Sequence, residues 1–152
     1  MDWRALVVLA HVLAAFWYVA GYVGTNLCTE LARRSTTDED CRAALMVSDR
    51  IDVVANRIGG TAVGLTGLVA LWVFGYSLTT PWILVSIILF AGVVIFGIFF
   101  WERVAAGVGS AARANDWAGV RRELSAPRVF ITGRVENLVV LTIITLMVLR
   151  PG

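Results

Sequence analysis

Long apolar stretches dominate the chain, and charged residues are concentrated in two segments between them. The longest apolar run, residues 58–101, contains no Asp, Glu, Lys, Arg or His. As a single helix it would be roughly 66 Å long at about 1.5 Å per residue, whereas the hydrocarbon core of a bilayer is only about 30 Å thick. The run therefore predicts two membrane spans, 58–77 and 81–101, with a turn between them and Pro81 as the first residue of the second.

Two further spans complete the predicted topology. Residues 5–28 form a first span with His11 as its only ionisable side chain. This stretch is longer than the apolar region of a signal peptide, so we interpret it as a retained helix. The last span is expected at 129–149, because its uncharged part alone is too short to cross and a full crossing takes in Arg134 and Glu136.

The polar connection 30–57 is predicted to contain an amphipathic helix. Thr36, followed three residues later by Glu39, has the spacing of a helix N-cap. Apolar residues then recur at helical intervals up to the second span. We therefore expect this helix to continue directly into the span, with packing beneath the helices as the alternative.

A second short helix is predicted in the connection 102–128. Trp117, Val120 and Leu124 share one helical face after Asp116. This face either lies in the headgroup region of the bilayer, with arginines toward anionic lipid, or belongs to a solvated loop helix.

Composition agrees with a membrane-embedded fold. The chain is 59% hydrophobic and 16% charged, whereas soluble domains carry about 25% charged residues. We predict one all-α, polytopic membrane domain over residues 1–152, with four transmembrane helices in an antiparallel bundle and short amphipathic cytoplasmic helices. The net charge of +2 and the absence of a basic stripe argue against nucleic acid as a partner. The expected partner is the lipid bilayer, with a homo-oligomer or a larger membrane complex left open.

The distribution of arginine predicts the orientation in the membrane. Every basic residue is an arginine, and all except Arg4 and Arg150 lie in or beside the two polar connections. The positive-inside rule places both connections in the cytoplasm and both termini outside a bacterial cytoplasmic (inner) membrane. Cys28 and Cys41 then lie at or below the cytoplasmic face, where thiols stay reduced, so we expect no disulfide.

His11 is the candidate cofactor-binding residue. On helical rise it lies about 9 Å inside the hydrocarbon, where ionisable groups commonly serve a function. A neutral imidazole can bind haem iron or copper or can bond to a quinone, and Met147 is a weaker candidate for a second axial ligand. Alternatively, His11 is a packed residue that is hydrogen-bonded to a neighbouring helix. The residues expected at equal depth are Trp72, Ser86, Thr142 and Thr145.

A second group of polar residues is predicted near the cytoplasmic ends of the spans. Its members are Arg57, Glu102, Arg134, Glu136 and Asn137. Charges at this level should pair or extend toward water, so they form either a structural ion-pair network or a pathway for a small solute or protons. The motifs of phosphate-binding, hydrolytic and zinc enzymes are absent from the sequence. We therefore expect a non-enzymatic accessory or structural protein, with a haem-, copper- or quinone-binding protein that uses His11 as the alternative.

Two short motifs carry a resemblance to known proteins. The segment from His11 through Trp17 to Gly21, and the ending from Leu146 to Gly152, resemble the opening and closing motifs of a family of small predicted integral membrane proteins of unknown function. More distantly, the chain is similar to the membrane domain of copper-resistance protein D and to the haem-dependent four-helix protoporphyrinogen oxidase. These relatives imply a first-helix histidine that matters, at the position of His11. The oxidase also uses a lysine, which this chain lacks.

Overall fold

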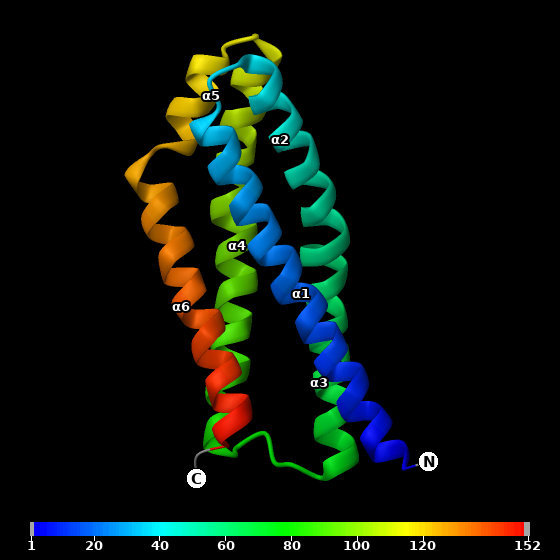
Figure 1. Ribbon diagram of the computed structural model, residues 1–152. Helices are drawn as coiled ribbons and strands as arrows, with labels where there is room; N and C mark the ends of the chain where they lie inside the picture. Colours follow the sequence, from blue (N-terminus) through cyan, green and yellow to red (C-terminus); the bar gives the residue numbers. More distant parts are fainter. Residues whose placement is uncertain (1, 151–152) are drawn as a thin grey trace. The chain divides into compact units, whose positions relative to one another are not determined.

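The computed structural model describes residues 2–150, and this part of the chain is helical with no strand (Figure 1). Four of its helices are long and apolar enough to cross a membrane, judged by length and composition. The predicted all-α class and the four apolar helices are therefore confirmed. The chain divides into two compact units, Met1–Ser77 and Leu78–Gly152. Their union in a single membrane domain over residues 1–152 stays a prediction.

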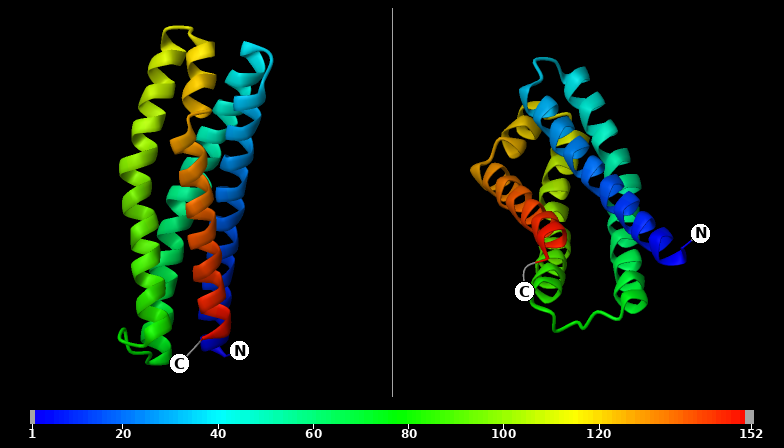
Figure 2. Two further views of the ribbon diagram at one scale, coloured as in Figure 1. Left: turned by 90° about the vertical axis from the view of Figure 1, so that its left-hand side faces the viewer. Right: turned by 60° about the horizontal axis from the view of Figure 1, so that its bottom comes forward.

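The first unit is a hairpin of two long helices. Helix α1 (Trp3–Arg34) is followed, after a short turn, by α2 (Asp38–Ile51), the π-helical segment η1 (Asp52–Ile58) and α3 (Gly59–Phe74). The last three elements form one continuous helix, which runs back along α1 (Figures 1 and 2). The expected continuation of the amphipathic helix into the second span is therefore confirmed.

Helix starts in the first unit follow local side-chain chemistry. The Asp2 carboxylate accepts a hydrogen bond from the Arg4 amide at 3.0 Å. The hydroxyl of Thr37 accepts from the Asp40 amide at 3.1 Å and donates to the Asp40 carboxylate at 2.7 Å. The N-cap of α2 is thus Thr37, one residue beyond the predicted Thr36. Thr36 and Thr37 each have an acidic residue three positions ahead, so this spacing did not distinguish them. The helix begins at Asp38 and therefore takes Thr37 as its cap.

Helix α3 ends earlier than the predicted span. Gly75 adopts the left-handed conformation, with φ of 66°, which glycine tolerates because it has no Cβ. The Tyr76 amide then donates to the Leu71 carbonyl at 3.1 Å, a bond typical of a glycine-terminated helix. The span therefore closes at Phe74 rather than at residue 77.

The second unit consists of α4 (Pro81–Arg113), α5 (Trp117–Leu124) and α6 (Pro127–Leu149). Helix α4 packs against both α5 and α6 (Figure 2). Its helical conformation extends past the apolar run through the start of the polar connection. Two of the helices, α4 and α6, begin at a proline, which suits the first helical position because its missing amide has no partner there.

The short amphipathic pattern predicted in the connection 102–128 corresponds to helix α5. The Asp116 carboxylate caps it by accepting from the Gly119 amide at 2.8 Å. Val120 and Leu124 are buried, and the Glu123 side chain approaches Gly107 of α4. Val120 and Leu124 are therefore covered by protein, whereas the sequence interpretation placed this face in the headgroup region or on a solvated loop helix.

Candidate functional site

One face of α1 forms the interface with the rest of the first unit. We call this set of residues the α1 seam. Its members, spaced alternately by three and four positions, are His11, Ala14, Tyr18, Gly21, Thr25, Cys28 and Ala32. This spacing keeps one stripe of a helix against a partner helix. Small residues occupy most of the buried positions, so the two backbones can approach closely, as helices do in lipid.

The closest approach lies at Gly21. A Cβ built on Gly21 would collide with the Ala55 side chain and would lie 3.1 Å from the Ala55 Cα and carbonyl carbon. Further along, a Cβ on Gly59 would meet the Tyr18 backbone at 3.3 Å, and one on Gly60 would meet the Tyr18 ring at 3.3 Å. Glycine is therefore required at position 21, and a side chain at Gly59 or Gly60 would displace Tyr18 by a few tenths of an ångström.

His11 bonds to the neighbouring helix through one ring nitrogen. Its Nδ1 lies 3.1 Å from Thr66 Oγ1, and the Thr66 hydroxyl lies 2.6 Å from the Ala62 carbonyl. The hydroxyl has a single proton, which the shorter contact assigns to the carbonyl. Placing that proton on the carbonyl makes Nδ1 of His11 the donor to Thr66, which is the tautomer in which Nε2 carries the lone pair. The arrangement offers one imidazole nitrogen as a hydrogen-bond acceptor or metal ligand.

The partner of His11 differs from those expected at equal depth. Trp72 is 81% exposed. The hydroxyls of Ser86, Thr142 and Thr145 donate instead to carbonyls four residues back in their own helices, at 2.7 to 2.8 Å. Depth in the membrane does not determine which helical face a residue occupies, and Thr66 is on the face of α3 that meets α1.

A second polar contact crosses the hairpin at η1. Asn56 Nδ2 donates to Thr25 Oγ1 on α1 at 3.2 Å and to Asp52 Oδ1 at 3.0 Å. Arg57 Nε donates to the other carboxylate oxygen of Asp52 at 3.1 Å. Arg57, which the sequence grouped with Glu136, is therefore engaged by Asp52 within the first unit. Sequence reasoning missed Thr25 and Asn56, although polar residues facing each other across adjacent spans are a signal for such bonds.

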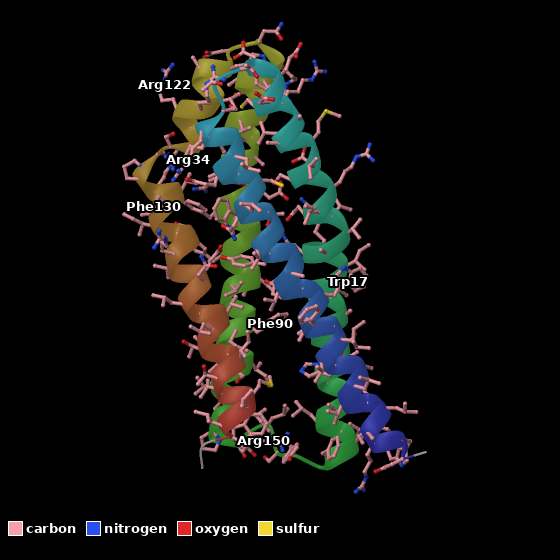
Figure 3. The ribbon with its side chains drawn as sticks, in the orientation of Figure 1. Trp17, Arg34, Phe90, Arg122, Phe130 and Arg150 are labelled. Carbon is pink, nitrogen blue, oxygen red and sulfur yellow. The ribbon has the colours of Figure 1, made fainter. Side chains whose placement is uncertain are left out.

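The other members of the predicted polar group lie in the second unit. Trp101 Nε1 donates to both carboxylate oxygens of Glu136 at 2.9 Å, and Glu136 is buried at 5% exposure. The Arg134 guanidinium lies 4.7 Å from the centre of the Phe130 ring, a cation–π contact on the same helix. Figure 3 shows Phe130 near the start of α6 and Arg150 at its far end. Glu102 and Asn137 are exposed.

Trp101 is the partner that the sequence interpretation overlooked. It is the last residue of the predicted span 81–101. A buried indole N–H requires an acceptor, and Glu136 is the only acidic residue in the last span. Those two facts together could have indicated the pair.

The remaining candidates are Met147 and the two cysteines. Met147, at 37% exposure, belongs to the second unit, whereas His11 belongs to the first. Among residues 2–150 there is no group of three or more His, Cys, Asp or Glu side chains that could hold a metal ion. Cys28 and Cys41 are buried and free. As the chain's single histidine, His11 is the one imidazole that could serve as a ligand.

The charged end of α1 has its own ion pairs. Glu30 lies beyond the apolar part of the helix and accepts from Arg33 and Arg34 (Figure 3 shows Arg34). The hydrogen bond from Arg33, aided by Arg34, lowers the pKa of Glu30 to about 2, and the same carboxylate raises the pKa of Arg33. These ion pairs form within the last two turns of a single helix. We therefore interpret them as stabilising the C-terminal end of α1.

Comparison with known proteins identifies a family. Residues 5–151 match the family described as "Predicted integral membrane protein (DUF2269)". No curated protein matches the chain. No solved structure matches it either.

Proposed function

Since the chain belongs to the DUF2269 family of predicted integral membrane proteins, we propose that it is a non-enzymatic accessory or structural component of the membrane. The observation that carries this proposal is the use of polar side chains within the first unit. His11 bonds to Thr66, and Asn56 bonds to Thr25, so each pair joins α1 to the helix beside it. Polar residues inside a membrane commonly stabilise helix association in this way.

We also propose the topology that the arginines indicate. Both polar connections face the cytoplasm of a bacterium, both termini lie outside the cytoplasmic membrane, and the four spans form one antiparallel bundle. The support is the positive-inside rule applied to the four apolar helices. Labelling introduced cysteines at Asp2 and Arg150 with an impermeant reagent in intact cells tests it. Opposite accessibility of the two ends would contradict it.

A second candidate function is cofactor binding at His11. The observation in its favour is the contact of Nδ1 with Thr66, which favours the tautomer that leaves Nε2 with its lone pair. Haem or copper bound there would supply redox chemistry. Thr66 would orient the imidazole for such a ligand, much as outer partners orient metal-binding histidines. His11 would supply one ligand to the bound iron or copper. Other groups would have to supply the remaining ligands.

Two substitutions at His11 separate the candidates. In His11→Asn the amide nitrogen takes the place of Nδ1 and keeps the bond to Thr66, but nothing replaces Nε2. In His11→Gln the amide reaches the Nε2 position and the bond to Thr66 is lost. A structural role predicts that the Asn variant unfolds like the wild type in detergent, whereas the Gln variant loses about 0.6 to 1.7 kcal/mol, the range for hydrogen bonds between membrane helices.

The absorption spectrum and metal content of freshly purified protein provide the second readout. For a structural protein we expect neither a Soret band nor bound copper in the wild type. Pigment or metal that is present in the wild type and absent from a stably folded His11→Asn variant would refute the structural proposal and support cofactor binding. Thr66→Val serves as the matched control, since it removes the same hydrogen bond and leaves the imidazole in place.

A further inference from the structure

The segment η1 (Asp52–Ile58) is wound as a π-helix between two α-helical segments of one continuous helix. Hydrogen bonds in a π-helix join residue i to residue i+5, and such segments are rare and frequently lie at functional sites. Most are single-turn bulges, whereas this one extends over 7 residues.

The ion pair between Asp52 and Arg57 has the spacing that this winding favours. On an α-helix the neighbouring surface residues are three or four positions apart. Asp52 and Arg57 are five apart, and their contact of 3.1 Å suits a helix in which residues i and i+5 lie one turn from each other. The same carboxylate accepts from Asn56, which also donates to Thr25 on α1. The pair thus fastens the π-helical turn and the contact with α1 together.

The winding of η1 determines which face of α3 meets α1. Downstream of it, Gly59 and Gly60 lie against Tyr18, and Thr66 bonds to His11. Rewinding the segment as α-helix would rotate α3 about its axis relative to α2 and would turn Thr66 away from the imidazole. We propose that the Asp52–Arg57 ion pair holds η1 in its π-helical winding and so sets the rotation of α3 that brings Thr66 to His11. The Asp52–Arg57 ion pair would thereby link the polar part of this helix to the position of Thr66 beside His11.

One polar atom of the segment is buried without a donor. Asn56 Oδ1 is buried and accepts no hydrogen bond from the described residues. A buried acceptor without a donor raises the free energy of the arrangement that buries it. The arrangement that buries this oxygen therefore depends on the bonds that Asn56 Nδ2 makes to Thr25 and Asp52.

The chain's single histidine makes the test direct. Full-length protein with ¹⁵N-labelled histidine is placed in nanodiscs of phosphatidylethanolamine and phosphatidylglycerol at pH 8, where an ordinary imidazole is neutral. The wild type should show one tautomer, with a protonated Nδ1 and an unprotonated Nε2. Arg57→Glu replaces attraction by repulsion at an exposed pair, which should shift the winding equilibrium roughly tenfold. Its spectrum should then contain the second tautomer.

Two further variants make the outcome decisive. Asp52→Arg combined with Arg57→Glu restores an ion pair at the same spacing and should return the wild-type spectrum. Arg34→Glu is the control, because it reverses one partner of Glu30 within α1, at the α-helical spacing of four, and should leave the imidazole signals unchanged. Unchanged signals in Arg57→Glu, an equal shift in Arg34→Glu, or failure of the reversed pair to restore them would each overturn the proposal. If Arg57→Glu does not fold, Asp52→Asn is measured in its place, with the same expectation.

Discussion

Gly21→Ala should destabilise the first unit, although alanine normally favours a helix. The new methyl group would collide with the Ala55 side chain and would approach the Ala55 backbone carbons at 3.1 Å. Backbone atoms cannot move aside as a flexible side chain can, so the cost should lie toward the upper end of the about 1–3 kcal/mol that overpacking causes. Against this, replacing glycine by alanine in a helix contributes about 1 kcal/mol. We expect a net loss of about 1–2 kcal/mol.

The assay is thermal or denaturant unfolding in detergent, followed by the helical circular-dichroism signal. Gly92→Ala provides the matched control. It is also a mid-helix glycine in an apolar span, but a Cβ there meets nothing within 4 Å, so the variant should be as stable as the wild type or more stable. Combining Gly21→Ala with Ala55→Gly removes the opposing methyl group and should recover part of the loss. Partial recovery is expected because the contact with the backbone remains.

The outcome that would refute this reasoning is specific. If Gly21→Ala and Gly92→Ala changed stability equally, the α1 seam would not be a close contact in the membrane. If Gly21→Ala were destabilising but Ala55→Gly did not relieve it, the added methyl group would be meeting some other neighbour.

Three further predictions follow from local contacts. Trp101→Phe removes the indole donor from the buried Glu136 carboxylate, which should cost about 1–3 kcal/mol; in a Glu136→Leu background the same change should cost less, and an equal cost would exclude the hydrogen bond as the cause. Gly75→Ala places a side chain at φ of 66° and should lose about 1–2 kcal/mol, measured by unfolding against Gly92→Ala. Because the pKa of Glu30 is lowered to about 2 from 4.5, its contribution to stability is full above pH 4.5 and is lost as pH falls through 2; carboxyl NMR titration should show this pKa rising in Arg33→Gln, and an unchanged value would contradict the pairing.

The helices were largely predictable because lipid imposes a simple rule on sequence. An apolar stretch of about 20 residues must become a helix when it crosses the bilayer. That rule identified all four long helices, including the last one with Arg134 and Glu136 inside it. It said nothing about where helices continue into water, and α1 and α4 both extend beyond their apolar parts. Their ends depend on the local backbone turns at Ser35 and Ala114 rather than on hydrophobicity.

The candidate site was harder to predict because partners depend on helix rotation. His11 was identified as an unusual residue from its isolation in an apolar span. Its partner was not, since depth alone proposed Trp72 whereas the rotation of α3 presents Thr66. We infer that this rotation follows from the π-helical winding of η1. No periodic pattern in the sequence predicts that winding. Asp52 and Arg57, five residues apart, carried the signal, but this spacing is informative only once the winding is known.

The hydrogen bond of His11 and the close packing of the hairpin depend on the same small residues. A Cβ on Gly67 would lie 3.2 Å from Cε1 of the His11 ring, so the imidazole fits against α3 because residue 67 has no side chain. The neighbouring residue, Thr66, supplies the acceptor for Nδ1. Gly67 thus makes room for the ring, and Thr66 orients it. The His11 tautomer should therefore respond to any change that separates or rotates the two helices, even one made far from His11, and this holds whether the imidazole serves packing or a ligand.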